Sequence, residues 1–114
     1  MKHTEYACEV DYDRQFDFLS FTRPKVKSTG SIVAGPFTID LHKNELAGIE
    51  IEHARSLLES LFGRSMDLRK ILNPRIGFQE KSNVLVLFLT FEYEKETLEQ
   101  KVVVTRSHTA PILA

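Results

Sequence analysis

Alternating apolar and polar residues predict strands in the first part of the chain. Apolar residues occupy every second position over Glu5–Tyr12, and apolar residues on both faces mark Phe16–Thr22. Such patterns are typical of β-strands, and the short polar stretch between them predicts a hairpin turn. The next segment, Arg23–Ser31, contains Pro24 and a Ser-Thr-Gly-Ser run, which predict a loop.

A second hairpin is predicted where Phe37–Leu41 and Gly48–Glu52 resume the alternation. A loop of three residues, Lys43–Glu45, brings the apolar side chains to one face, because it pairs Phe37 with Ile51, Ile39 with Ile49 and Leu41 with Ala47. Asn44 or Glu45 then adopts the left-handed conformation, and Asp40 lies opposite Gly48.

The period changes from two to about 3.6 residues after His53, which predicts a helix. Its apolar stripe consists of Ala54, Leu57, Leu58, Leu61 and Phe62, and Gly63 provides a stop. A short second helix from Ser65 to Leu72 is predicted to end before Pro74. We expect these helices to cover the sheet.

The last third predicts a meander of three strands, Arg75–Glu80, Val84–Tyr93 and Leu98–Arg106. Connections of three and four residues place Phe78 beside Val86 and Val102 beside Leu89. The outer strands then extend opposite faces of the middle strand, which is apolar on both sides. We expect one face to be covered by helices, and the other by the first sheet or a second subunit.

Together these elements predict an α+β fold, in which antiparallel strand meanders flank a short helical middle and helix covers the sheet. We expect one domain over residues 1–114, made of a strand meander over 11–54, a helical segment over 55–72 and the second meander over 75–106.

Composition narrows the classes of function. The net charge is −1, with 42% hydrophobic and 27% charged residues, so no general attraction to nucleic acid or anionic membrane is expected. The only cysteine, Cys8, excludes an intrachain disulfide, and no apolar run reaches the roughly 20 residues of a membrane span. These features predict a cytosolic protein with no membrane association.

Four short motifs in the first half resemble a family of small bacterial and archaeal domains of unknown function. They are Tyr12-Asp13, Asp17-Phe18-Leu19, Phe37-Thr38-Ile39-Asp40-Leu41, and Gly48-Ile49-Glu50-Ile51 with Ala54. The resemblance covers Asp11 to Ala54 and implies a small α+β fold with a strand meander. It implies no activity, cofactor or partner.

The best candidate for chemistry is the set of carboxylates Asp40, Glu50 and Glu52 on the second hairpin, together with His42 and His53. Alternate residues on paired strands share a face, so these groups are candidates for binding a divalent metal or a small ligand. The solvated polar face of a half-exposed sheet explains the same residues more simply. No catalytic residue and no cofactor are predicted.

Arg23, Lys25 and Lys27 share one face of the extended segment around Pro24 and are candidates for contacting phosphates. Lysine and proline also protect edge strands from unwanted pairing, and this simpler explanation makes nucleic-acid binding an unlikely alternative.

Because no catalytic group stands out, the sequence favours a non-enzymatic interaction or assembly module that acts as a homodimer. A further protein partner is possible, but the sequence does not identify one. The doubly apolar strand from Val84 to Phe91 motivates this hypothesis. Metal or small-ligand binding at the carboxylate hairpin is the first alternative, and nucleic-acid binding by the basic linker is the second.

Overall fold

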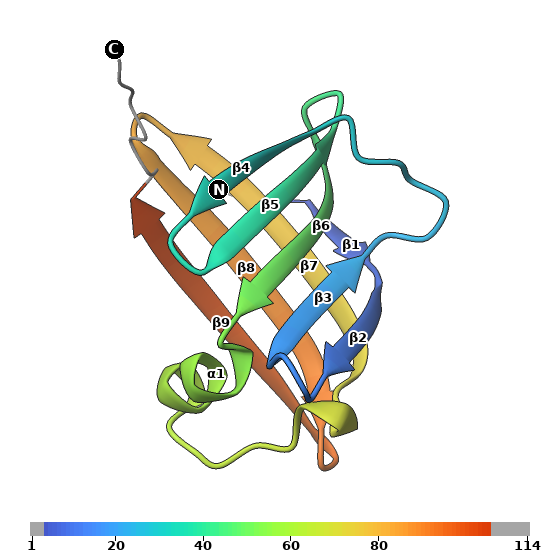
Figure 1. The fold of residues 1–114 in the computed structure, drawn as a ribbon, viewed down its shortest axis with the longest axis vertical. Coiled ribbons are helices and arrows are strands. Elements are labelled where there is room, and N and C mark those ends of the chain that lie inside the picture. The colour runs from blue at the N-terminus through green and yellow to red at the C-terminus, as the bar shows by residue number, and fades with distance from the viewer. Residues whose placement is uncertain (1–3, 106–114) are drawn as a thin grey trace.

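The computed structural model describes residues 4–105 of the 114-residue chain. These residues form nine strands, one α-helix and one short 3-10 helix, labelled in Figure 1. The strands are β1 (Glu5–Ala7), β2 (Glu9–Asp13), β3 (Phe18–Thr22), β4 (Gly30–Ala34), β5 (Phe37–His42), β6 (Glu45–Glu52), β7 (Leu72–Lys81), β8 (Val84–Tyr93) and β9 (Glu96–Thr105). The helices are α1 (Ala54–Phe62) and η1 (Leu68–Lys70).

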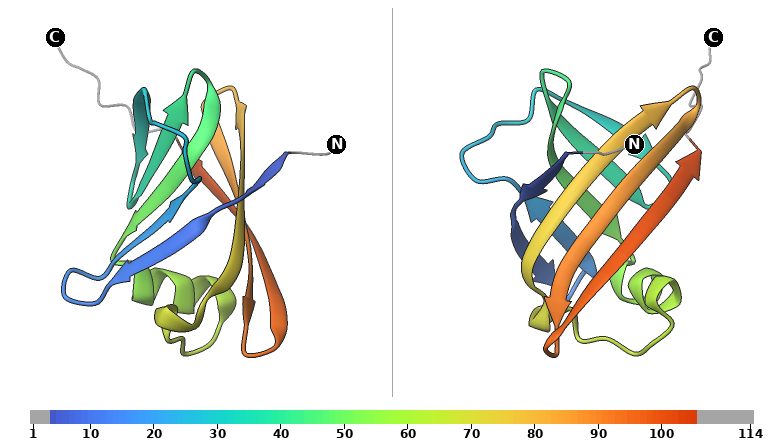
Figure 2. Two further views of the ribbon diagram at one scale, coloured as in Figure 1. Left: turned by 90° about the vertical axis from the view of Figure 1, so that its right-hand side faces the viewer. Right: turned by 180° about the vertical axis from the view of Figure 1, so that it is seen from behind.

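The strands form two antiparallel sheets. The four-stranded sheet has the order β1-β7-β8-β9, and the five-stranded sheet has the order β2-β3-β6-β5-β4. Figure 2 shows the sheets as two layers that face each other, with α1 at one end between them. The α+β fold, with antiparallel meanders around a helical middle, is therefore confirmed.

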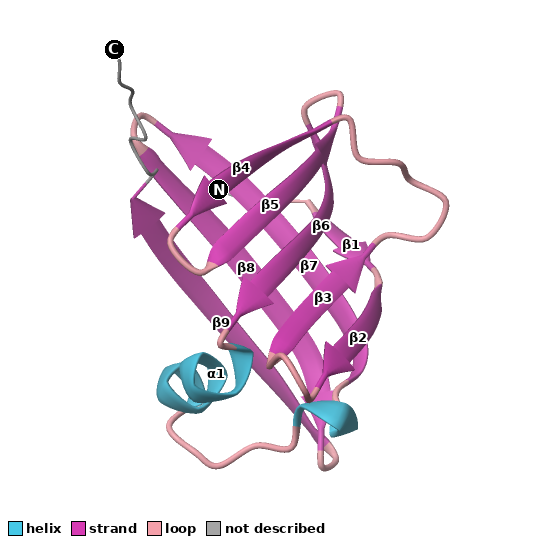
Figure 3. Cartoon of the chain, viewed as in Figure 1, coloured by secondary structure: helices cyan, strands magenta, loops and turns pink. Residues whose placement is uncertain are grey.

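The core lies between the layers and consists of their inward side chains. Phe21, Phe37 and Phe91 are its largest fully buried members. Each sheet thus covers most of the other, and the helical contribution is confined to one end (Figure 3). There Ala54 and Leu58 of α1 are buried, and the Phe62 ring meets Phe91 edge to face at 5.3 Å. Gly63 ends the helix in the left-handed conformation, as predicted.

The strand predicted over Glu5–Tyr12 is divided at Cys8 between the two sheets. β1 pairs with β7 and β2 pairs with β3, so this stretch links the layers along one side. At the crossing, the Cys8 N–H donates to the carbonyl of Pro74 at 3.1 Å, and the thiol contacts the same oxygen at 3.5 Å. Burial raises the pKa of Cys8 to about 12, so the thiol stays protonated and is a poor nucleophile.

The predicted second helix from Ser65 to Leu72 is wrong. Only Leu68–Lys70 are helical, as a 3-10 turn, and Leu72 already belongs to β7. Asp67, rather than Ser65, caps this turn by accepting a hydrogen bond from the Arg69 N–H.

The predicted loop Arg23–Ser31 is also too long, because strand β4 begins at Gly30. Its pairing with β5 overrides the turn propensity of the Ser-Thr-Gly-Ser run.

The predicted register of the second hairpin is confirmed for two pairs, Phe37 with Ile51 and Ile39 with Ile49. Leu41 pairs with Leu46 instead of Ala47, because a bulge follows Asp40. The turn therefore has two residues, Lys43 and Asn44, both with positive φ.

The predicted registers of the last meander are wrong. Two-residue turns at Ser82-Asn83 and Glu94-Lys95 replace the longer loops, so Leu87 lies between Phe78 and Val102. Both neighbours of β8 consequently extend its inner face, rather than opposite faces. Arg106, the last residue of the predicted meander, lies outside the described residues.

Candidate functional site

Of the three candidate carboxylates, the structure brings Asp40 and Glu50 together on the outer face of the five-stranded sheet. Asp40 lies on β5 opposite Gly48 of β6, which places Glu50 diagonally across from it. A hydrogen bond to Asp40, then burial, then the negative charge of Asp40 raise the pKa of Glu50 to about 7. The Glu50 carboxyl group is therefore protonated below about pH 7.

Contacts within the protein account for the position of this carboxyl pair, so no ligand is needed to explain it. The Ser31 hydroxyl donates to Asp40 Oδ1 at 2.7 Å. Glycine is required at position 48, because a Cβ there would lie 2.7 Å from the carbonyl oxygen of Phe21 and 3.7 Å from Asp40 Oδ2. The predicted structural link between Asp40 and Gly48 is thus confirmed.

A metal site does not assemble at this pair. Glu52 is exposed at the end of β6, and His42 turns its Nδ1 to the carbonyl of Lys27 at 2.8 Å. Within residues 4–105, no group of three or more histidine, cysteine or acidic side chains is arranged to hold a metal ion.

The strands of the five-stranded sheet contain seven acidic residues and no lysine or arginine. The seven are Glu9, Asp11, Asp13, Asp40, Glu45, Glu50 and Glu52. This sheet therefore repels phosphates and other anions.

The basic linker does not present its three cations as one surface. Arg23 is held by the fold: its guanidinium lies 3.8 Å from the centre of the Tyr6 ring, and Nη1 donates to the carbonyl of Leu46 at 2.7 Å. Lys25 and Lys27 are exposed. Two exposed lysines give a smaller positive surface than the sequence predicts.

The outer face of the four-stranded sheet carries a group of apolar side chains, which we call the outer patch. It consists of Val84, Val86 and Phe88 on β8 and Val103 on β9. Val86, which is only 6% exposed, lies directly opposite Val103, whose surface is 60% exposed. No element within residues 4–105 packs over this face, which points away from the other sheet (Figure 2).

Charges of both signs surround the outer patch. Lys101 lies opposite Phe88, and Glu99 lies opposite Thr90. On the far side of the same face, Arg75 pairs with Glu5 at 3.4 Å. The outer patch is therefore a short apolar strip with a mixed rim, unlike the other sheet, on whose strands the charged side chains are all acidic.

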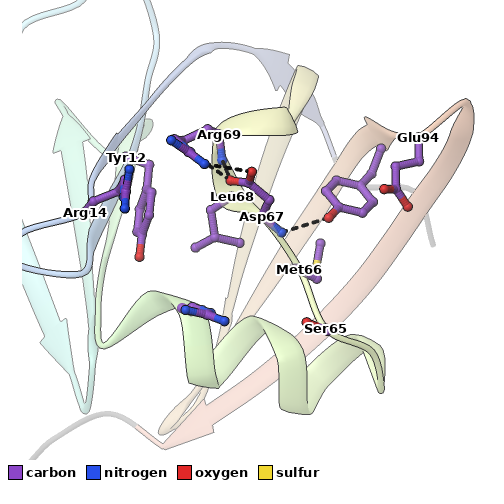
Figure 4. A pocket seen from close by; sticks show the side chains of 10 residues that line it. Tyr12, Arg14, Ser65, Met66, Asp67, Leu68, Arg69 and Glu94 are labelled. Carbon is purple, nitrogen blue, oxygen red and sulfur yellow. Dashed lines mark hydrogen bonds and ion pairs between the residues drawn. The ribbon is translucent and has the colours of Figure 1, made fainter.

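A cleft of about 580 Å³ opens at the end of the molecule where α1 lies (Figure 4). Sequence reasoning missed it, because four separate segments line it: the end of β2, the start of α1, the connection to η1 and the β8–β9 turn. Arg14, Arg55 and Arg69 provide its positive charge, and Asp67 and Glu94 its negative charge.

Asp17 fixes one wall of the cleft. Its Oδ1 accepts hydrogen bonds from the Tyr12 hydroxyl at 2.7 Å and from the Arg55 N–H at 2.9 Å. Burial, followed by the hydrogen bond to Asp17 and its charge, raises the pKa of Tyr12 to about 12. The Tyr12 phenol therefore stays neutral, and Asp17 caps α1, a role that His53 at the N-cap position does not perform.

The fold and these surfaces define the protein as a small two-sheet antiparallel β protein with one helix closing an end. No family model, curated protein or solved structure matches the chain. The resemblance of residues 11–54 to domains of unknown function therefore stays a prediction. No helix among the described residues is long and apolar enough to span a membrane.

Proposed function

We propose that the protein is a non-enzymatic interaction module that forms a homodimer through the outer patch. The observation that carries this proposal is the 60% exposure of Val103, next to the buried Val86, on a sheet face over which no described element packs. Burying such a strip against a second sheet removes apolar surface from water, at about 25 cal/mol per Å².

The charges around the outer patch favour a second copy of this chain as the partner. In a two-fold symmetric dimer each patch meets itself, so a rim with both signs can pair Lys101 or Arg75 with Glu99 of the other copy. The charged side chains on the strands of the five-stranded sheet are all acidic, so its outer face would repel its own copy. Self-association is therefore directed to the four-stranded sheet.

The alternatives drawn from the sequence have less support. The carboxyl pair Asp40–Glu50 has hydrogen-bond partners within the protein, and Glu52 does not join it. Arg23 is tied to Tyr6 and Leu46, which weakens the nucleic-acid alternative. A cytosolic location remains our proposal, based on the lone thiol Cys8.

Sedimentation velocity over a micromolar concentration series tests the proposed dimer. We expect a concentration-dependent shift from the monomer mass of 13.1 kDa towards twice that mass. A mass that stays at the monomer value throughout the series would refute the proposal.

A further inference from the structure

We propose that the cleft between β2, α1, η1 and the β8–β9 turn binds a small organic anion through Arg14, Arg55 and Arg69. The ligand carries a phosphate or carboxylate group and is small enough for a cleft of about 580 Å³. This inference is independent of the proposed dimer, because the cleft lies at the helix end of the molecule and not on the outer patch (Figure 4).

The three arginines line the cleft together with the Tyr12 side chain. The three groups come from segments that are distant in sequence, so the fold brings them together. Figure 4 shows Arg14 and Arg69 near Tyr12 on the same side of the cleft.

The fold leaves many of the guanidinium N–H groups available to a ligand. Arg69 uses Nε and Nη2 on the two oxygens of Asp67, both at 3.0 Å, and Arg55 uses Nε on Glu59 at 3.3 Å. Arg14 forms no hydrogen bond or ion pair with any other residue between 4 and 105. A guanidinium group has five N–H donors, so all three arginines retain free donors.

The carboxylates at the cleft already have partners within the protein. Three arginines and two acids line it, and Asp17 and Glu59 beside the lining accept hydrogen bonds from Tyr12 and Arg55. Glu94 is already paired outside the cleft with Arg64 at 2.8 Å and with Lys70 at 3.6 Å. The neutral Tyr12 phenol adds no negative charge, so an oxyanion is the group that the free guanidinium donors match best.

Buried side chains form the floor of the cleft. Met66, Leu68 and Tyr93 lie behind the arginines and are almost fully buried, so a ligand meets mainly polar groups. The Tyr93 hydroxyl accepts the Asp67 N–H at 2.8 Å, which holds the η1 segment against β8. A volume of about 580 Å³ holds a small organic anion.

Titrations followed by the NMR signals of the arginine side chains test this site. The probes are phenyl phosphate, benzoate and, as the neutral control, phenol, all at low ionic strength because salt screens exposed charges. For ligands of this size we expect dissociation constants of about 1–10 mM for one or both anions. The two anions distinguish a phosphate ester from a carboxylate, and phenol is expected to leave the signals of Arg14, Arg55 and Arg69 unchanged.

The Arg14→Ala variant provides the decisive comparison, because Arg14 is exposed and forms no bond that the fold requires. We expect it to weaken binding about tenfold. The matched control is Lys27→Ala, which removes one positive charge from the exposed loop before β4, away from the cleft lining. The proposal is overturned if neither anion shifts the cleft signals, if phenol shifts them equally, or if both variants weaken binding to the same extent.

Discussion

Gly48 shows how one missing side chain determines the local structure of the five-stranded sheet. Its Cα hydrogen leaves room for the carbonyl of Phe21 and for the Asp40 carboxylate. The sequence predicted this position, because the alternation of Phe37–Leu41 and Gly48–Glu52 places Asp40 opposite Gly48 in a single register.

We therefore expect Gly48→Ala to lower the free energy of unfolding by about 2 kcal/mol, because the added methyl group meets backbone that cannot rotate away. Urea titration measures the loss. Gly30→Ala is the matched control, since a Cβ at Gly30 has no heavy atom within 4 Å and that glycine has no positive φ. Equal effects of the two substitutions would contradict this explanation of Gly48.

Glu50 is expected to make stability depend on pH. Its pKa in the folded protein is about 7, above the ordinary value of 4.5, so the folded state holds a proton that the unfolded state has released. The stability contribution of the protonated pair is complete below pH 4.5 and is lost as the pH rises through about 7.

Glu50→Gln removes this dependence, because an amide does not ionise. One pKa unit corresponds to about 1.4 kcal/mol, and solvent screening of a half-exposed pair reduces the total effect to about 1 kcal/mol. Between pH 5 and pH 8 the wild type should lose about this much stability relative to Glu50→Gln, measured by denaturant unfolding. A difference between the two proteins that is the same at both pH values would refute the raised pKa of Glu50.

At the scale of elements, α1 depends on a cap from another part of the chain. The His53 backbone is left-handed and its side chain makes no capping hydrogen bond. Asp17, in the β2–β3 turn, accepts the Arg55 N–H instead. The sequence predicted the apolar stripe and the end of this helix, but a cap that lies 38 positions away has no local signal.

Asp17→Ala should therefore destabilise the protein by about 1–2 kcal/mol, the usual cost of losing an N-cap. Asp17→Asn keeps an oxygen acceptor and tolerates the positive φ of 52° at this position, so it should lose less than half as much. Tyr12→Phe removes only the hydrogen bond from the Tyr12 hydroxyl to Asp17, so its effect measures that bond apart from the helix cap. Unfolding in urea gives all three values, and an Asp17→Asn variant as unstable as Asp17→Ala would contradict the capping role.

Turn length explains which strand registers could be predicted. The β5–β6 register followed from the apolar pattern, since only one pairing brought the isoleucines together. In the last meander β8 is apolar on both faces, so every register buries apolar residues. The apolar pattern therefore does not select one register over another. There the positive φ of Ser82, Glu94 and Lys95 permits two-residue turns, although none of these residues is glycine.

At the scale of the whole molecule, the sequence predicted the class of fold but not the pairing of its sheets. No glycine or proline beside Cys8 marks the point where the chain passes from one sheet to the other. The serine-rich stretch before β4 predicted a loop at the position where this strand begins. The cleft could not be predicted either, because Arg14, Arg55 and Arg69 become neighbours only through folding. The acidic outer face was predictable, because its residues alternate along individual strands.

The central claim is that two copies associate through the outer patch. Val103→Lys places a charge in the middle of that patch, at a side chain that is 60% exposed and tolerates the change in the monomer. Val33→Lys is the matched control, because Val33 is 55% exposed on the five-stranded sheet. Both variants add one positive charge.

Sedimentation velocity of the wild type and these two variants, at equal micromolar concentrations, tests the claim most directly. We predict a dimer for the wild type and for Val33→Lys, and a monomer for Val103→Lys, since the new ammonium group would have to be buried against its own copy. A monomeric wild type, or a Val103→Lys variant that remains as dimeric as Val33→Lys, would contradict the claim.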